Sequence, residues 1–315
     1  MGIILGLSAA LFWGTADFLV RYSTRIIGTY RTLFYMQFIG LACLSIFLVA
    51  SGEFTRLAAR ISWQWWILAI LTALLNVISA LALYRSFEIG VLAIVSPVAA
   101  SSTALTVVLA IISGEMISRA RGLGIAAALI GVVLAATHFT PLSDTKEVDT
   151  TTKSTLNPNR IYANLGLLRR GQLTRGVGWA LVAAVGYGID FWLLGIYITP
   201  VFGGIMPVWI IRSTTICTLA LFATPARQSL RWPAWKAWRL IIPIGILDTM
   251  AFLSVAIGYT ADQVSVVSVL ASLFSAVTVL LAWIFLHEKL QWSQWLGISI
   301  IFLGVILVKF WVIIH

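Results

Sequence analysis

The chain has 315 residues, of which 60% are hydrophobic and only 10% are charged, and its formal net charge is +10. Soluble domains contain about 25% charged residues, so this composition cannot cover the surface of a water-soluble globule of this size. It excludes a soluble enzyme, a nucleic-acid-binding protein and a disordered chain, and it predicts a protein embedded in a lipid bilayer.

Ten apolar segments are long enough to cross a bilayer as helices, which takes about 20 mostly apolar residues. The first has no basic region before it, so it is interpreted as a spanning helix rather than a cleavable signal peptide. Barrel strands would be shorter and would alternate in polarity, so the continuous runs predict an all-α, multi-pass protein of the plasma (inner) membrane. The predicted spans are residues 3–20, 32–50, 65–84, 91–112, 122–138, 177–198, 203–223, 239–259, 264–286 and 292–313.

One polar stretch, residues 139–175, separates the fifth predicted span from the sixth. It is rich in Thr, Ser and Asn, a composition typical of a linker. The chain is therefore predicted to consist of a first unit, residues 1–138, and a second unit, residues 176–315, with five spans in each.

The two units show signs of an internal repeat. Asp17-Phe18 recurs as Asp190-Phe191 at an offset of 173 residues, and Asn76 meets Asp248 at an offset of 172. Glycines and tryptophans elsewhere in the two units follow the same offsets. Because each unit has an odd number of spans, the second must enter the membrane from the opposite side, which predicts an inverted repeat, the architecture of many secondary transporters.

Four ionisable residues are predicted at membrane depth: Asp17, Asp190, Arg212 and Asp248. Such residues are expensive in a bilayer and are functional hypotheses by default. A carboxylate in a dry cavity could take up a proton or bind a cationic amine. The alternative is a structural ion pair in which Arg212 compensates Asp190 or Asp248, and this pair is the favoured role of Arg212. For Asp17 a structural or gating role is favoured over substrate binding.

Aromatic side chains could wall a cavity among these spans and stack on a flat or cationic ligand. The candidates are Trp13, Tyr84, Tyr187, Trp192 and Phe252. Together with Asp17, Asn76, Asp190 and Asp248 they make up the predicted substrate-binding set. Pro97 and Pro207 could break their helices and free carbonyl groups, although a tolerated kink is the alternative.

No set of residues suggests catalysis or a cofactor. The sequence has no His, Cys and acid spacing that suits a metal ion, and no Walker-type glycine loop with a lysine. We therefore expect no enzyme activity, no metal, no other cofactor and no ATP-driven pumping by this chain.

Several short motifs stand out along the two units: Trp13-Gly14, Ser96-Pro97, Gly114-Glu115, Gly124, Gly131, Pro207, Arg212, His287-Glu288-Lys289, Gly297 and Gly304. With these residues and five spans in each unit, the chain resembles the drug/metabolite transporter superfamily, in its EamA-type ten-helix branch. Two positions depart from the family pattern: Leu270 stands where the counterpart of Pro97 is expected, and Gln37 stands where the counterpart of Arg212 is expected. The resemblance implies a transporter whose cavity is lined by the first, third, fourth, sixth, eighth and ninth helices.

The function that these observations favour is a secondary transporter that moves a small metabolite or drug-like solute by alternating access. Amino acids or amines are the favoured class, protons are a candidate coupling ion, and Arg212, Gln37 and Pro97 are assigned to ion pairing or gating. The alternatives are a lipid flippase or facilitative channel on the same fold, and a membrane-embedded enzyme acting on lipids. Import and export both stay open, as do monomer and homodimer.

Two indications of orientation disagree. Most of the Lys and Arg residues fall in the loops after the odd-numbered spans, and the positive-inside rule would place those loops in the cytoplasm and both termini outside. The family resemblance implies cytoplasmic termini instead.

Overall fold

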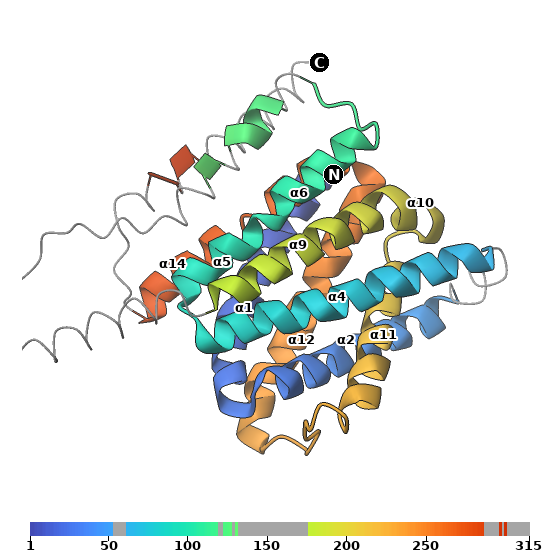
Figure 1. Cartoon of the computed structure of the whole chain (residues 1–315). Coiled ribbons are helices and arrows are strands. Elements are labelled where there is room, and N and C mark those ends of the chain that lie inside the picture. Colours follow the sequence, from blue (N-terminus) through green and yellow to red (C-terminus); the bar gives the residue numbers. More distant parts are fainter. Residues whose placement is uncertain are drawn as a thin grey trace, which may run out of the picture.

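The structure is a computed structural model, and it describes residues 1–52, 61–118, 122–127, 130–131, 176–286, 296–297 and 299–300. The described residues form helices joined by short turns, with no strand among them (Figure 1). Seven of the described helical stretches are long and apolar enough to cross a membrane, and Met206–Phe222 is a shorter apolar helix. The linker and most of the fifth and tenth predicted spans lie outside the described residues.

The first half contains five described helices, and the second half contains seven. Those of the first half are α1 (Gly2–Ile27), α2 (Thr29–Ser51), α4 (Trp63–Ile89), α5 (Leu92–Ala100) and α6 (Ser102–Ile112). Those of the second half are α9 (Val177–Leu193), the π-helical turn η1 (Leu194–Ile198), α10 (Thr199–Phe202), α11 (Met206–Phe222), α12 (Trp235–Ala261), α13 (Val264–Ala271) and α14 (Phe274–Leu286).

Several helices extend beyond their predicted apolar spans. The helix α1 continues from Val20 through Arg21 and Arg25 to Ile27, and it ends only at Gly28, whose φ is +86°. Hydropathy marks the part of a helix that lies in hydrocarbon, whereas the helix itself continues until a residue such as glycine changes the backbone conformation. These predicted segments were therefore right in kind and short at their ends, whereas the seventh, residues 203–223, extends beyond both ends of its helix, Met206–Phe222.

The fourth and ninth predicted spans are each broken into two helices, at Ser101 and at Ser272–Leu273. Both serines have φ −63° and ψ −13°. The Ser101 hydroxyl donates to the carbonyl of Val98 at 2.7 Å, and the Ser272 hydroxyl donates to the carbonyl of Val269 at 2.7 Å. A serine that binds a carbonyl of the preceding turn competes with the helical ladder and bends the helix. The second break occurs without a proline, so Pro97 alone does not explain the first.

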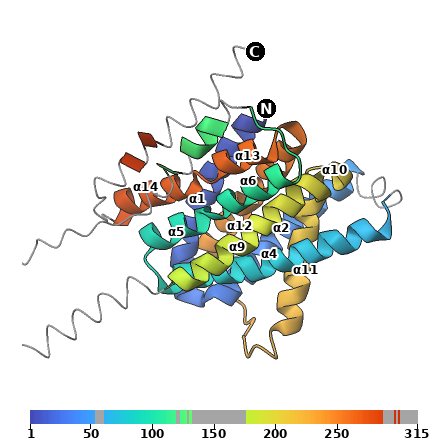
Figure 2. The same ribbon diagram turned by 45° about the horizontal axis from the view of Figure 1, so that its top comes forward.

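The helices of one half pack mainly against those of the other, and the pattern is unchanged when the halves are exchanged. The helix α1 packs against α12, α13 and α14, while its repeat counterpart α9 packs against α4, α5 and α6. Likewise α2 packs against α12, α11 packs against α4, and α2 and α11 pack against each other. Figure 2 shows α6, α9 and α4 lying side by side. Such swapped pairs are the mark of a two-fold relation.

Matched glycine contacts repeat this symmetry at the level of single atoms. A Cβ atom on Gly14 would lie 2.9 Å from the carbonyl oxygen of Phe274, and one on Gly188 would lie 2.9 Å from that of Ser102. The Thr278 hydroxyl donates to the Gly14 carbonyl at 3.2 Å, and the Thr106 hydroxyl donates to the Gly188 carbonyl at 3.0 Å. Small residues here let helices from the two halves approach closely.

Candidate functional site

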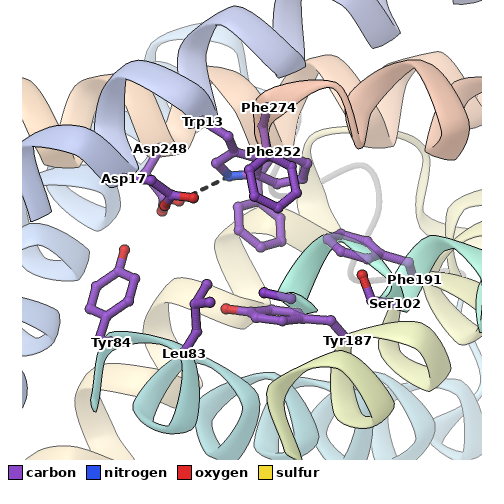
Figure 3. Close-up of a pocket in the computed structure, with 11 residues that line it drawn as sticks. Trp13, Asp17, Leu83, Tyr84, Ser102, Tyr187, Phe191, Asp248, Phe252 and Phe274 are labelled. Atoms are coloured by element: carbon purple, nitrogen blue, oxygen red, sulfur yellow. Dashed lines mark hydrogen bonds between the residues drawn. The ribbon is translucent and has the colours of Figure 1, made fainter. Parts of the chain in front are cut away.

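A cavity lies between the two halves, where α1, α4, α5, α6, α9, α12 and α14 meet (Figure 3). These helices belong to the six spans that the family resemblance implied. The space between the side chains totals about 440 Å³, but the centre of a water molecule fits in only about 40 Å³ of it. In this conformation the cavity therefore has room for a few water molecules. Its lining residues are Trp13, Asp17, Leu83, Tyr84, Ala99, Ser102, Tyr187, Phe191, Asp248, Phe252 and Phe274.

Two carboxyl groups, those of Asp17 and Asp248, lie side by side at one end of the cavity (Figure 3). Asp248 is held on both of its oxygens: Oδ1 accepts a hydrogen bond from Trp13 Nε1 at 3.0 Å, and Oδ2 lies 2.6 Å from Nη1 of Arg212. Among the described residues, Asp17 has no hydrogen-bond or ion-pair partner. The two acids therefore differ: Asp248 is already paired, and Asp17 is available to a ligand.

Arg212 lies behind the cavity rather than in its lining, and its side chain is completely buried. Its Nη1 contacts both Asp248 and the side-chain oxygen of Gln37, and its guanidinium carbon lies 4.9 Å from the centre of the Phe252 ring. The sequence left two acids as candidate partners, and the structure pairs Arg212 with Asp248. Gln37 and Arg212 are repeat counterparts, and they contact each other as residues close to a two-fold axis do.

Aromatic rings form most of the cavity wall. Trp13 packs against Phe191, Phe252 and Phe274, with ring centres 5.5, 5.0 and 6.3 Å apart. Tyr187 stacks on Phe191 at 5.6 Å. The hydroxyl groups of Tyr84 and Tyr187 point into the space beneath the two carboxyl groups (Figure 3). Rings in these edge and offset arrangements give a rigid, apolar enclosure that also presents π-faces to a cation.

Six of the nine predicted substrate-binding residues line this cavity. Those six are Trp13, Asp17, Tyr84, Tyr187, Asp248 and Phe252. The structure places the other three, Asn76, Asp190 and Trp192, outside it. Asn76 Nδ2 donates to Asp190 Oδ2 at 2.8 Å at a buried helix contact, and Trp192 Nε1 donates to the hydroxyl of Ser113 at 2.8 Å in an exposed position.

Helix geometry explains this division. Tyr187 and Phe191 are four residues apart and so share a face of α9, which is the face turned to the cavity. Asp190 and Trp192 each lie about 100° around the helix from Phe191 and point elsewhere. Phe191 itself was not among the predicted site residues, although the repeated Asp-Phe motif marked its position. Phe274 and Ser102, which were also missed, flank the two helix breaks.

A second hollow lies on the outer side, between α2 and α12 and beside Ile205. It is open to the outside, spans about 810 Å³ and is almost entirely apolar. Several of its lining residues, such as Cys43, Phe47 and Met250, are exposed. A lipid flippase needs a polar groove open to the lipid to pass a headgroup, and this hollow is apolar instead. Within the described residues, no cluster of His, Cys, Asp and Glu could hold a metal ion.

Comparison with known proteins gives one family and one fold. The sequence model of the EamA-like transporter family matches residues 1–137 and 174–310, two ranges whose starts are 173 residues apart. No curated protein matches the chain significantly. Among 24 matching chains of solved structures is a crystal structure with a TM-score of 0.68 and 19% identity, covering 98% of this chain and 96% of its own. At this identity the likeness shows the fold alone.

Proposed function

The chain belongs to the EamA-like transporter family, and on that premise we propose that it moves small amine-bearing solutes through the central cavity by alternating access. Membership of a transporter family accounts for a membrane-embedded, all-helical chain with two repeats. The proposal adds the class of solute, the residue that binds it and the motion that carries it across.

The observation that carries the proposal is the carboxyl group of Asp17, which has no partner among the described residues and faces an aromatic cavity. The charges of Asp248 and Arg212 offset each other at 2.6 Å, so an ionised Asp17 leaves the cavity with a net negative charge. An ammonium group beside Asp17 would satisfy this charge and gain from the π-faces of Phe191 and Phe252. An amine with a flat or hydrophobic body fits both features of the lining.

The same charges disfavour phosphorylated solutes. Within the described part of the chain, Arg212 is the cation nearest the cavity, and it is fully buried behind the lining and paired with Asp248. A nucleotide sugar or a sugar phosphate would meet Asp17 without a free cation to compensate it, so we expect these solutes to be excluded.

Alternating access is supported by the two-fold packing between the halves. The cavity is enclosed by helices of both halves, and it is too narrow here for a solute larger than a few water molecules. A solute can therefore enter only when helices of the two halves move apart. Because the halves are related by a two-fold axis, a motion of one half opens the cavity to one side of the membrane. The equivalent motion of the other half opens it to the opposite side.

Substrate counterflow in proteoliposomes tests the proposal. The purified protein would be offered hydrophobic amines, aromatic amino acids and a nucleotide sugar, and we expect counterflow of the amines. Asp17→Asn should weaken amine affinity by about 10- to 100-fold, because one charged hydrogen bond is lost. Asp262→Asn, which removes a carboxyl group just beyond the end of α12, serves as the matched control.

The outcomes separate the parts of the proposal. Counterflow of the nucleotide sugar without that of any amine would contradict the solute class. Unchanged amine affinity in the Asp17→Asn variant would contradict the role of Asp17. A steady ion or solute current without counterflow would favour a facilitative channel instead.

A further inference from the structure

A second polar pair lies apart from the cavity, where α4 of the first half packs against α9 of the second. Asn76 Nδ2 donates to Asp190 Oδ2 at 2.8 Å. Asp190 is completely buried, and Asn76 is 1% exposed. The remaining oxygen of each side chain, Asp190 Oδ1 and Asn76 Oδ1, is buried without a hydrogen-bond partner in the structure. Two acceptor oxygens thus lie in one buried pair with a single donor group between them.

The sequence repeat shows what this place lacks. By sequence offset Asp17 and Asp248 correspond to Asp190 and Asn76, although the matched contacts of Gly14 and Gly188 put Asp190 one residue out of register with Asp17 in space; at the cavity, Arg212 supplies a positive charge to Asp248. The counterpart of Asp248 is the neutral Asn76, and the counterpart of Arg212 is the neutral Gln37. Both charges of an ion pair are therefore absent beside Asp190, while its own carboxyl group is kept.

The helices around Asp190 provide no other cation. Within their described residues, α5 and α6 contain no ionisable side chain, and η1 contains only Tyr197. The helix α4 contributes Tyr84 in the cavity lining, and Arg85 and Glu88, which pair with each other at 2.9 Å two to three turns beyond Asn76.

The remaining titratable neighbours are tyrosines and acids. On α9 itself, Tyr187 faces the cavity. From α12, Tyr259 shares a hydrogen bond with Ser268 at 2.7 Å. Asp17 of α1 and the paired Asp248 are acids of the cavity, so neither can compensate a negative charge on Asp190. An ionised carboxylate buried without a cationic partner is far more costly than a neutral acid, so this environment favours the neutral form of Asp190.

We propose that Asp190 and Asn76 form a proton-binding site that couples transport to protons, an inference that rests on the transport function proposed above. Asp190 Oδ1 carries the proton and donates it to Asn76 Oδ1, while Asn76 Nδ2 donates to Asp190 Oδ2. The two hydrogen bonds close a ring, and both of the otherwise unpartnered oxygens are satisfied.

The position of the pair explains the coupling. The ring joins α4 of the first half to α9 of the second, so it is intact only while these helices are packed. When the halves move apart and water reaches Asp190, the O–H bond on Oδ1 breaks and the proton passes to a water molecule on the open side. Repacking of α4 against α9 takes a proton up again. A protein that binds a proton in one conformation and releases it in another is driven between them by a pH gradient.

Asp190→Asn tests the coupling, because the variant keeps the shape of the side chain and one hydrogen bond to Asn76 but cannot release a proton. We expect that a pH gradient no longer drives substrate accumulation, while counterflow at equal pH on both sides is kept. Asp262→Asn should retain both activities. Full gradient-driven accumulation by the Asp190→Asn variant overturns the proposal, and so does accumulation driven by a sodium gradient that this variant abolishes.

Infrared spectroscopy tests the proton itself without any transport. A free aspartate, with a pKa of about 3.9, is ionised at pH 7, so a carbonyl band of a neutral carboxylic acid at that pH reports a protected proton. We expect the wild-type protein to show such a band, with a component that is lost in Asp190→Asn and kept in Asp17→Asn. Absence of the band from the wild-type protein, or an unchanged band in Asp190→Asn, overturns the proposal.

The two readouts also separate this inference from the proposed function. If the wild-type protein shows no counterflow of any solute but has the Asp190-dependent band, the transport proposal fails and the proton site stands. If counterflow occurs and the band does not, the proton site fails alone. Should Asp190→Asn not reach the membrane, a shift of the same band in Asp190→Glu assigns the proton.

Discussion

Asp248→Asn should destabilise the protein more than Arg212→Met, although each change removes one partner of the same ion pair. Arg212 is completely buried, its Nε and Nη2 atoms have no hydrogen-bond partner in the structure, and Asp248 lies 2.6 Å from its Nη1. Asp248→Asn therefore leaves a buried guanidinium with no negative charge beside it, and the single amide oxygen can accept from Trp13 or from Arg212 but not from both. Stranding a buried charge in this way costs about 3–5 kcal/mol.

Arg212→Met should cost less, because the carboxyl group of Asp248 that it leaves unpaired is better compensated than the guanidinium group. After Arg212→Met, Asp248 still accepts the hydrogen bond of Trp13 at 3.0 Å, and its side chain is 8% exposed at the cavity, where water or a proton can compensate it. We expect a loss of about 1–3 kcal/mol, as for a charged hydrogen bond. In the Asp248→Asn background, Arg212→Met should restore stability, because it removes the stranded charge.

The free energy of unfolding of the purified protein in mixed micelles, followed by tryptophan fluorescence against denaturant, measures all four members of this double-mutant cycle. The reasoning is refuted if Arg212→Met costs as much as Asp248→Asn, or if the double variant is less stable than Asp248→Asn alone.

Three further outcomes follow from the structure. Trp13→Phe keeps a ring in the aromatic wall but removes the donor to Asp248 at 3.0 Å, so the unfolding free energy should fall by about 1.5–3 kcal/mol. Gly188→Leu would place a Cβ atom 2.8 Å from the Cβ of Leu105, and overpacking should lower the unfolding free energy by about 1–3 kcal/mol or more. In the control Gly178→Ala, the new Cβ meets nothing within 4 Å, so the unfolding free energy should be unchanged or higher. Unfolding in micelles measures both variants. A C-terminal reporter active only outside the cytoplasm should be active if the basic loops are cytoplasmic, and fluorescence from a cytoplasm-only reporter would contradict that orientation.

Much of the architecture could be predicted because it depends on composition along the chain. The apolar runs predict spanning helices, and the all-helical character of the described residues and the transporter family are confirmed. The repeat was predicted from Asp17, Asn76, Asp190 and Asp248, and the starts of the two family matches are 173 residues apart, the offset of Asp17 and Asp190. The ten-span count stays a prediction, since most of the fifth and tenth segments lie outside the described residues.

The sequence by itself determined that the chain crosses a membrane, that it repeats, and that a few charges at membrane depth need partners. Only the tertiary structure decided how those charges divide: Arg212 pairs with Asp248, Asp17 faces the cavity, and Asp190 lies against Asn76 outside it. The physical reason is that lipid and protein interior are both apolar, so a spanning helix carries little amphipathic signal of which face meets a neighbour. That face is set by packing between helices that are more than a hundred residues apart in the chain.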